Sequence, residues 1–467
     1  MTDIMSFRKL LFSVLVILSL TASAQQERET DSLIVKKLSE WQDLKFGFMI
    51  HWGFYSQWGV VESWSICSEP WIDRHGANYV DYVRDYQALN KTFNPVDFDP
   101  DYWASVASEA GMRYVVFTTK HHDGFCMFDT KETSYSITDA SCPFSSNKYA
   151  DVTAALLKAF RKKNFMTGLY FSKADWHHQD YWAPEWATPD RNVNYDPSLY
   201  PERWQRFCDF TYNQIKELTH NYGDIDILWL DGGWIRPENS LTDEYRQWLG
   251  CNGWIQDIDM PKIAAMAREN NPDLIIVDRT VHGKYENYMT PEQQIPYTLL
   301  PYPWETCMSM GNSWSYNKND EYKSTNVLIH YLVDIVAKGG NFLLNVGPGP
   351  DGKLPEDAVK RMKEIGAWMR VNGDAIYDSR PVYPYSDGNL RYTQGKDGTI
   401  YAIVLLEEDE LFPHLINING IKKLKTGRLK IKGSKVKAML SRTKTGYQIT
   451  VDEEVPLQHA VVIEMKK

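Results

Sequence analysis

The sequence predicts an α/β chain in which a (β/α)8-like TIM barrel is followed by an antiparallel β-sandwich. Short apolar runs alternate with segments of helical period through the first three quarters of the chain, which is typical of repeated βα units around a parallel sheet. Near Asp374 the pattern changes to alternating apolar and polar residues joined by turns. The 467 residues suit one barrel, which needs roughly 250 residues or more, and a smaller domain. We expect three parts: a signal peptide at 1–24, a catalytic barrel at 25–373 and a sandwich at 374–467.

The N-terminal segment predicts export. Arg8 and Lys9 precede an apolar stretch at 10–20, which leads to Ala22-Ser23-Ala24, a small-x-small pattern that signal peptidases cleave. The stretch is shorter than the roughly 20 residues that span a bilayer, and no cysteine follows the cleavage pattern to accept a lipid. We therefore expect a periplasmic or secreted protein that is not inserted in the membrane after cleavage.

The barrel elements follow in order along the chain. The predicted strands are 46–50, 113–118, 166–171, 225–230, 274–277 and 342–346, and the predicted helices between and after them are 101–110, 151–163, 202–221, 327–338 and 356–371. Gly339-Gly340 ends the fourth of these helices. In the last domain, strands are predicted at 400–405, 415–418, 447–451 and 460–464.

Composition narrows the class of partner. The formal charge of −10 argues against nucleic acid as a partner, because phosphates demand basic surfaces. The 13% aromatic content suits stacking on sugar rings, although a large core also uses aromatics. The six cysteines form no C-x-x-C pair, so we expect free thiols rather than a zinc ribbon, a redox motif or a disulfide framework; they are Cys67, Cys126, Cys142, Cys208, Cys251 and Cys307.

Polar residues stand where barrel strands are predicted to end, which is where barrel enzymes carry their chemistry. They are His51, His121, His122, Tyr170 and Asp231. Asp231 is followed by two glycines and flanked by Trp229 and Trp234, as a glycosidic nucleophile would be, although an Asp in a turn also caps helices or binds loop amides. The adjacent pair His121-His122 lacks the i, i+4 spacing of a helical zinc pair, so no metal is expected.

Five motifs resemble those of glycoside hydrolase family 29, the α-L-fucosidases, and occur in that family's order. They are Phe-Gly-Phe-Met-Ile-His-Trp-Gly at 46–53, Lys-His-His-Asp-Gly-Phe at 120–125, Leu-Tyr-Phe-Ser at 169–172, Trp-Leu-Asp-Gly-Gly at 229–233 and Gly-Asn-Phe-Leu-Leu-Asn at 340–345. The resemblance implies a barrel followed by a β-sandwich. It also implies exo-acting, retaining hydrolysis of terminal α-L-fucose from a fucosylated oligosaccharide or glycoconjugate, without a cofactor. It leaves the oligomeric state open.

The resemblance also implies roles for individual residues. Asp231 becomes the nucleophile, and the residues that bind fucose or support the nucleophile are His51, Glu69, Trp71, His121, His122, Tyr170, Trp229, Arg279 and Trp314. Glu69 and Trp71 stand in Ser-Glu-Pro-Trp at 68–71, with one residue more than the family's Glu-Trp pair. Trp314 matches an aromatic wall for the C6 methyl group of fucose. Glu69, Arg279 and Trp314 could instead serve packing.

The general acid is the least determined residue. Glu286, Glu292 and Glu305 are the candidates, and the order of acidic residues after Arg279 resembles the family's arrangement in a way that favours Glu292. Two other functions stay open: a glycan-binding protein without turnover, and a retaining exo-glycosidase for another sugar such as an α-galactoside. Linkage preference is expected to depend on the long segments 175–200 and 237–254.

Overall fold

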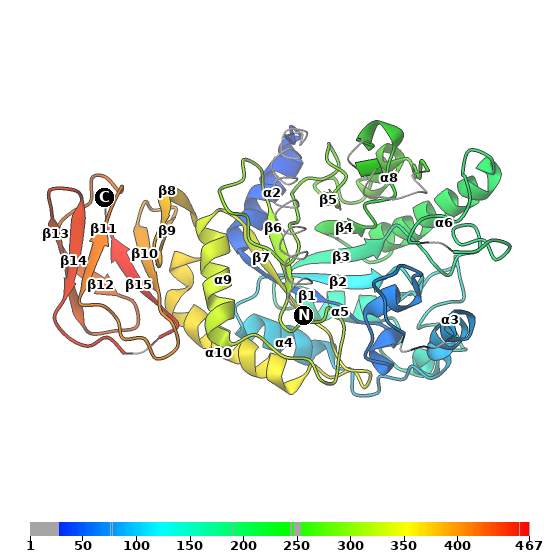
Figure 1. Ribbon diagram of the computed structural model, residues 1–467, viewed down its shortest axis with the longest axis horizontal. Coiled ribbons are helices and arrows are strands. Elements are labelled where there is room, and N and C mark those ends of the chain that lie inside the picture. The colour runs from blue at the N-terminus through cyan, green and yellow to red at the C-terminus, as the bar shows by residue number, and fades with distance from the viewer. Residues whose placement is uncertain are drawn as a thin grey trace.

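The computed structural model describes residues 28–466, apart from 75, 77, 189, 243–244, 247–253 and 457. The expected signal peptide, Cys251 and part of the segment 237–254 lie outside the described residues. A barrel with surrounding helices forms one end of the molecule and a smaller all-β part forms the other, with α9 and α10 between them (Figure 1). Among the described residues, no helix is both long enough and apolar enough to cross a bilayer.

A curled parallel sheet of seven strands builds the barrel, in the order β5-β4-β3-β2-β1-β7-β6. Its strands are β1 (Phe46–Ile50), β2 (Tyr114–Lys120), β3 (Met166–Ser172), β4 (Ile227–Asp231), β5 (Ile275–Asp278), β6 (Glu305–Ser309) and β7 (Asn341–Val346). The six predicted barrel strands are confirmed to within two residues at each end. The sequence analysis did not predict β6.

The position between β5 and β6 is occupied by the irregular segment 286–292. Glu286 bridges to Val277 of β5, whereas Met289 and Glu292 bridge to Trp304 and to Cys307 of β6. The backbone amide of Glu305 donates to the Met289 carbonyl oxygen at 2.9 Å, which adds to this pairing. The segment therefore takes the place of an eighth strand without strand regularity.

The strands are apolar on both faces because each face packs against a core, as is usual for parallel sheets. Phe46, Phe48 and Ile50 of β1 pack outward in the layer beneath the helices, whereas Met49 points into the barrel. The N-terminal helix α2 (Ser32–Leu44) contributes Trp41, which stacks on Tyr288 at a centroid distance of 4.0 Å. This stack belongs to the core inside the barrel.

Helices surround the barrel, and the five predicted helices are confirmed to within two residues. Besides α2 they are α3 (Tyr79–Gln87), α4 (Pro100–Glu109), α5 (Val152–Arg161), α6 (Pro201–His220), α8 (Met260–Ala267), α9 (Thr325–Ala337) and α10 (Glu356–Asn372). Side-chain caps begin several of them: Asp99, Asp151 and Ser324 accept hydrogen bonds from backbone amides of α4, α5 and α9.

The C-terminal strands form one antiparallel ladder in the order β11-β14-β13-β12-β15-β10-β9-β8, which lies in two layers (Figure 1). They are β8 (Arg380–Asp387), β9 (Leu390–Gln394), β10 (Ile400–Leu405), β11 (Leu415–Ile418), β12 (Gly427–Ile431), β13 (Lys437–Arg442), β14 (Tyr447–Val451) and β15 (Ala460–Met465). Only two residue pairs join β12 to β15, so the sheet can fold over at that seam. The two layers enclose a separate apolar core, and this arrangement confirms the predicted sandwich.

Hydrogen bonds fix the sandwich to the barrel helices. The Trp368 indole of α10 donates to the Ala460 carbonyl oxygen at 2.9 Å, and the Asn326 amide of α9 donates to the Leu406 carbonyl oxygen at 2.8 Å. Tyr401 and Val462 of the sandwich pack into the core beneath the barrel helices. The change from barrel to sandwich falls between Asn372, where α10 ends, and Arg380, where β8 begins.

Candidate active site

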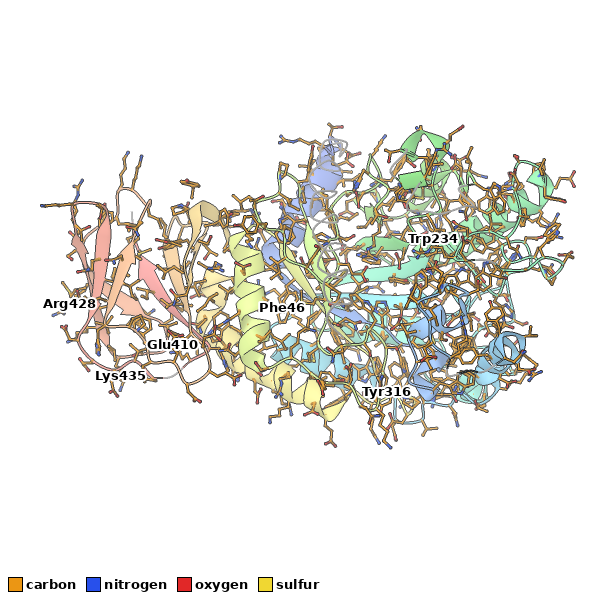
Figure 2. The ribbon with its side chains drawn as sticks, viewed as in Figure 1. Phe46, Trp234, Tyr316, Glu410, Arg428 and Lys435 are labelled. Atoms are coloured by element: carbon orange, nitrogen blue, oxygen red, sulfur yellow. The ribbon has the colours of Figure 1, made fainter. Side chains whose placement is uncertain are left out.

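A pocket of about 490 Å³ opens at the carboxyl ends of the barrel strands. The predicted site residues that line it are His51, Trp71, His121, Tyr170, Trp229, Asp231, Arg279, Glu292 and Trp314. Further lining residues that the sequence analysis had not assigned to a site include Glu62, Trp64, Arg191, Tyr245 and Cys307. Trp234 marks this rim in Figure 2, on the side of the barrel away from the sandwich.

Asp231 ends β4 and presents its carboxylate to this pocket. The Tyr170 hydroxyl donates to its Oδ2 at 2.8 Å, and an Arg279 nitrogen donates to its Oδ1 at 3.3 Å. Burial alone would raise the pKa of Asp231, but the charge of Arg279, the nearby His122 ring and the hydrogen bond from Tyr170 outweigh it. The pKa of Asp231 therefore lies well below its usual value, and the carboxylate stays ionised.

Arg279 also binds a second carboxylate. Its other terminal nitrogen donates to Glu292, so one guanidinium contacts both acidic groups. Its Cζ atom lies 5.1 Å from the Trp229 ring centroid, so the guanidinium packs against the pocket floor. Because the donors of the planar guanidinium point in fixed directions, Arg279 holds the two carboxyl groups close to each other in the pocket.

The three acid candidates occupy different places. Glu292 lines the pocket with 41% of its side chain exposed. Glu286 is 2% exposed and accepts from the Thr280 amide at 2.8 Å, outside the pocket lining. Glu305 is fully buried inside the barrel, where the Tyr114 hydroxyl donates to it at 2.6 Å and the Trp229 indole at 3.3 Å. Of the three, Glu292 alone reaches the pocket lining.

His51 and His122 are held in defined tautomers by their neighbours. The Asn345 amide donates to the Trp314 carbonyl oxygen, so its own Oδ1 accepts from His51 Nδ1 at 2.9 Å. The Ser172 hydroxyl donates to the Ala174 carbonyl oxygen, so its oxygen accepts from His122 Nδ1 at 2.6 Å. Both Nε2 atoms are thereby left as acceptors, and that of His122 lies 3.8 Å from Asp231 Oδ2.

Burial keeps the site histidines neutral. It lowers the pKa of His51 and of His122 to about 4 and the pKa of His121 well below its usual value. His121 contacts the Ser63 hydroxyl through Nδ1, and its ring lies parallel to the Tyr170 ring at a centroid distance of 5.5 Å. His122 is not among the lining residues but packs behind them, against Trp176 and Trp234. Neutral imidazoles can accept hydrogen bonds from sugar hydroxyls.

Glu69, expected to bind sugar, does not line the pocket. Its carboxylate accepts two hydrogen bonds from Arg191, one of them at 2.6 Å, and a third from the Trp71 indole at 2.8 Å. The Arg191 guanidinium lies over the Trp64 ring at 4.8 Å. Glu69 thus fixes Arg191, and Arg191 and Trp71 form part of the pocket wall.

Glu62 is the acidic residue that lines the pocket in this region. It accepts from the Ser315 amide at 2.8 Å, and burial raises its pKa to about 7. Its backbone has a φ of +38°, which is rare for a residue other than glycine and points to a functional constraint. The signal in the sequence was a Glu two residues before Trp64 and shortly after the His51 motif.

The Lys-His-His-Asp-Gly-Phe motif depends on its glycine. Gly124 has a φ of +79°, and a Cβ atom there would lie 2.2 Å from Asp175 Oδ1. Asp175 in turn forms a buried ion pair with Lys120 at 3.2 Å. The backbone of the motif thus packs closely against the loop that contains Asp175, and this contact fixes the two histidines of the motif.

No group of three potential ligands that could hold a metal ion occurs in the described part of the chain. The described cysteines are free: Cys67, Cys126, Cys142 and Cys307 are buried and Cys208 is partly buried. The expectation of free thiols is confirmed for these five residues.

Comparison with known proteins connects this site to a family. The α-L-fucosidase family model matches residues 14–374. The α-L-fucosidase of Dictyostelium discoideum is 28% identical, with 96% of each chain covered, and the tissue α-L-fucosidase of Mus musculus is 30% identical over 80% of this chain and 79% of the relative.

Solved structures agree in fold over nearly the whole chain. The α-L-fucosidase isoenzyme 1 from Paenibacillus thiaminolyticus has a TM-score of 0.76 at 29% identity, covering 93% of this chain and 99% of its own. The α-fucosidase of Thermotoga maritima in complex with fucose has a TM-score of 0.69 at 25% identity, covering 94% and 100%. Since the family model spans most of the sequence, the chain belongs to the α-L-fucosidase family.

Proposed function

We propose that this chain is an exo-acting, retaining α-L-fucosidase in which Asp231 is the nucleophile and Glu292 is the general acid and base. The observation that carries the assignment is the Arg279 guanidinium, which contacts both carboxyl groups at the floor of one pocket. A retaining glycosidase needs two such groups about 5 to 5.5 Å apart, and one shared fork is compatible with that spacing.

In the first step, ionised Asp231 attacks the anomeric carbon of fucose and the bond to the leaving oxygen breaks. Glu292 brings the proton that this oxygen takes up. The product is a β-linked fucosyl-enzyme ester. Tyr170 and Arg279 keep Asp231 ionised and oriented for the attack, because both donate hydrogen bonds to it.

In the second step, Glu292 accepts a proton from a water molecule, which attacks the anomeric carbon and releases Asp231. Two inversions give overall retention, so the first product is α-L-fucose. Every proton and electron pair is provided by the two carboxyl groups, the sugar and water.

The remaining lining residues support recognition of a small neutral sugar. The Nε2 atom of His51 is left to accept from a hydroxyl group, and the indole of Trp314 lies 5.1 Å from the His51 ring as an apolar wall for the C6 methyl group. Trp229 and Tyr170 stack at 5.2 Å and form the floor. A pocket of about 490 Å³ fits one terminal sugar and part of the next, which favours exo action.

The test is hydrolysis of nitrophenyl α-L-fucoside by wild type, Asp231→Ala and Glu292→Ala, each with and without azide. We expect Asp231→Ala to be nearly inactive and to yield β-fucosyl azide, because azide replaces the missing nucleophile. Glu292→Ala should form the fucosyl-enzyme from this activated substrate and yield α-fucosyl azide. Glu286→Gln is the matched control and should keep most of the activity.

Other outcomes would redirect the assignment. Azide products from Glu286 variants instead of Glu292 variants would move the acid role to Glu286. Binding of fucosides without release by wild type would favour a glycan-binding protein, and release from a nitrophenyl galactoside alone would favour another exo-glycosidase.

We also propose that residues 1–24 are a signal peptide and that the mature enzyme is periplasmic or secreted. The basic residues, apolar stretch and Ala22-Ser23-Ala24 support this. The same proposal divides the mature chain into a catalytic domain at 25–373 and a sandwich at 374–467, supported by the two sheets and by the separate sandwich core. N-terminal sequencing of exported protein should give Gln25 as the first residue.

A further inference from the structure

The distal sandwich carries a charge opposite to that of the rest of the protein. From Lys422 to Lys444 stand ten lysines and arginines, and no Asp or Glu occurs from Leu411 to Val451. The whole chain has a formal charge of −10, so all the other residues together carry −20. Such segregation is not required to fold a β-sheet, and it creates a local positive potential.

Strands β12 and β13 turn three of these charges to one side of the sandwich. Ala438 and Leu440 point into the sandwich core, so the residues that alternate with them point outward. We define the basic face as the exposed, outward-pointing side chains Arg428, Lys430 and Lys437 on these strands.

The basic face contains an unfavourable pair. Lys430 lies directly opposite Lys437 in the ladder, and like charges in that position destabilise a sheet. Lys430 has one carboxylate partner, Glu464 at 3.3 Å, whereas Arg428 and Lys437 form no ion pair within the described residues. An anion from outside the protein would relieve this repulsion.

Neighbouring side chains favour a glycan over a lipid surface. Met439 and Ser441 of β13 lie opposite Thr450 and Gln448 of β14, and Gln448 donates to Asn417 of β11 at 3.0 Å. Hydroxyl and amide groups of this kind bind sugar hydroxyls. The exposed apolar side chains on this side of β11 to β14 include Met439 and Leu415, and two such side chains are too few to insert into a membrane.

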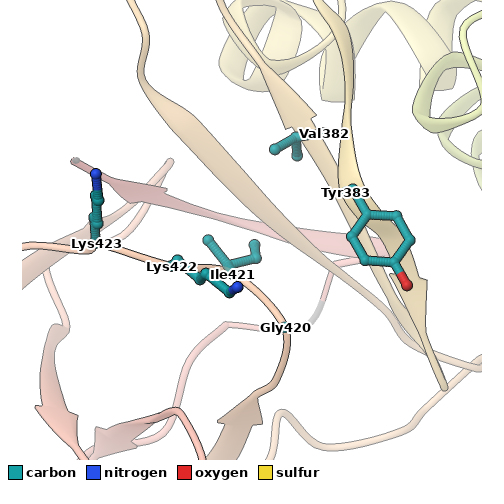
Figure 3. A pocket seen from close by; sticks show the side chains of 6 residues that line it. All are labelled: Val382, Tyr383, Gly420, Ile421, Lys422 and Lys423. Carbon is teal, nitrogen blue, oxygen red and sulfur yellow. The ribbon is translucent and has the colours of Figure 1, made fainter.

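A hollow of about 430 Å³ adjoins the loop that leads into β12 (Figure 3). Tyr383 of β8, which is 81% exposed, lines it together with Lys422 and Lys423. An exposed aromatic ring stacks on sugars, and two ammonium groups pair with anionic substituents. The hollow therefore combines the two kinds of contact that an anionic sugar needs.

We propose that the basic face and this hollow bind a sulfated polysaccharide, which holds the enzyme on a sulfated, fucosylated polymer. The choice of a glycan rests on the proposed fucosidase function. Because the barrel is acidic, a sulfated substrate would repel it, and a basic surface elsewhere on the enzyme would offset this repulsion. Arg428 and Lys435 lie at the end of the molecule away from Trp234 at the pocket rim (Figure 2). The surface therefore tethers the enzyme to the polymer without contributing to the chemistry, and raises the local concentration of fucosyl ends.

The experiment measures binding of the full mature protein to immobilised dextran sulfate, with neutral dextran and phosphatidylglycerol vesicles as parallel probes. The test variant combines Arg428→Thr, Lys430→Thr and Lys437→Thr, since threonine suits an exposed strand. The matched control removes three exposed barrel lysines with the same change in charge: Lys91→Thr, Lys131→Thr and Lys163→Thr.

We expect wild type to bind dextran sulfate and not dextran, with an affinity that falls as salt rises. The test variant should bind about tenfold or more weakly, because each lost cation removes a contact that releases counterions. The control variant should bind within about twofold of wild type, since its lysines lie elsewhere. Both should keep the wild-type kcat/KM on nitrophenyl fucoside, which tests the proposed function separately.

Three results would overturn the proposal: no preference of wild type for dextran sulfate over dextran, an equal loss in the two triple variants, or tighter binding to vesicles than to dextran sulfate. The last result would assign the basic face to a membrane surface. Absence of fucosidase activity in wild type would overturn the proposed function and leave the binding measurement standing.

Discussion

Replacing the buried Glu305 by glutamine should change how the stability of the protein depends on pH. Glu305 lies fully buried inside the barrel, where it accepts from the Tyr114 hydroxyl and the Trp229 indole. Burial raises its pKa to about 7 from a usual value of 4.5. A glutamine resembles the protonated acid in size and in having one acceptor oxygen and one donor group, and it does not titrate.

The direction and the size of the change in stability with pH follow from this pKa shift. Between about pH 4.5 and pH 7 the folded protein keeps a proton on Glu305 that the unfolded chain has lost, so stability falls as pH rises through this window. A difference of about 2.5 pKa units corresponds to roughly 3 kcal/mol as an upper bound. An amide at this position carries no such loss, so Glu305→Gln should gain stability relative to wild type as pH rises.

Thermal unfolding at pH 4.5 and pH 7.5 measures this, with the exposed Glu109→Gln as the matched control. The Tm of Glu305→Gln minus that of wild type should increase by several degrees between the two pH values, and Glu109→Gln should show no such increase. A difference that stays constant with pH would refute the buried, protonated state of Glu305. Trp229, which donates to Glu305, packs against Tyr170 and Arg279 in the pocket. Glu305→Gln keeps an acceptor for the indole and should therefore keep activity. Glu305→Ala leaves two buried donors unsatisfied and should lose both stability and kcat.

Three further predictions concern the pocket. The inhibition constant of L-fucose should rise as pH falls through about 4, because His51 accepts from a sugar hydroxyl as a neutral ring with a pKa near 4; an inhibition constant that stays unchanged as pH falls through 4 would contradict this. Glu62→Ala should lower kcat/KM on nitrophenyl fucoside by about 100-fold, whereas Glu69→Ala should lower it by less than about tenfold, since Glu62 alone of the two lines the pocket; the reverse order would restore Glu69 to the sugar site. Tyr170→Phe removes a hydrogen bond to Asp231, the proposed nucleophile, and should lower kcat by about 10- to 100-fold at unchanged Tm, and an unaffected kcat would exclude Tyr170 from orienting Asp231.

Regular elements were predictable because their patterns are local. An apolar run such as Phe46–Ile50 is buried on both faces, and a helix such as Pro201–His220 has an apolar stripe, so each can be read without knowledge of its neighbours. Strand β6 was not predicted because Glu305–Ser309 contains only one strongly apolar residue, Met308. Its Glu, Thr and Ser side chains are buried by partners far away in sequence. Polar residues that are buried by long-range contacts do not follow a local hydrophobic pattern.

The same limit applies to the site residues. Asp231, His51 and Tyr170 end or follow regular strands, so the barrel geometry alone brings them together. Glu62 belongs to a one-turn 3-10 helix with a strained backbone, and no periodic pattern marks it. Glu69 and Glu62 both stand near a tryptophan, and the three-dimensional path of the loop decides which of the two reaches the pocket.

Glu292 shows why the acid was the least certain assignment. It stands in the segment that replaces a barrel strand, after Pro291 and before Gln293, whose φ of +54° ends any extended conformation. What positions Glu292 is its bridge to Cys307 on β6, together with the hydrogen bond from the Gln293 amide to the Cys307 carbonyl oxygen at 3.0 Å. Closure of the barrel between β5 and β6 and placement of Glu292, the proposed acid, therefore depend on the same backbone contacts. Without β6, the sequence favours Glu292 by resemblance alone, because the pairing with β6 that brings Glu292 to Arg279 follows no local pattern.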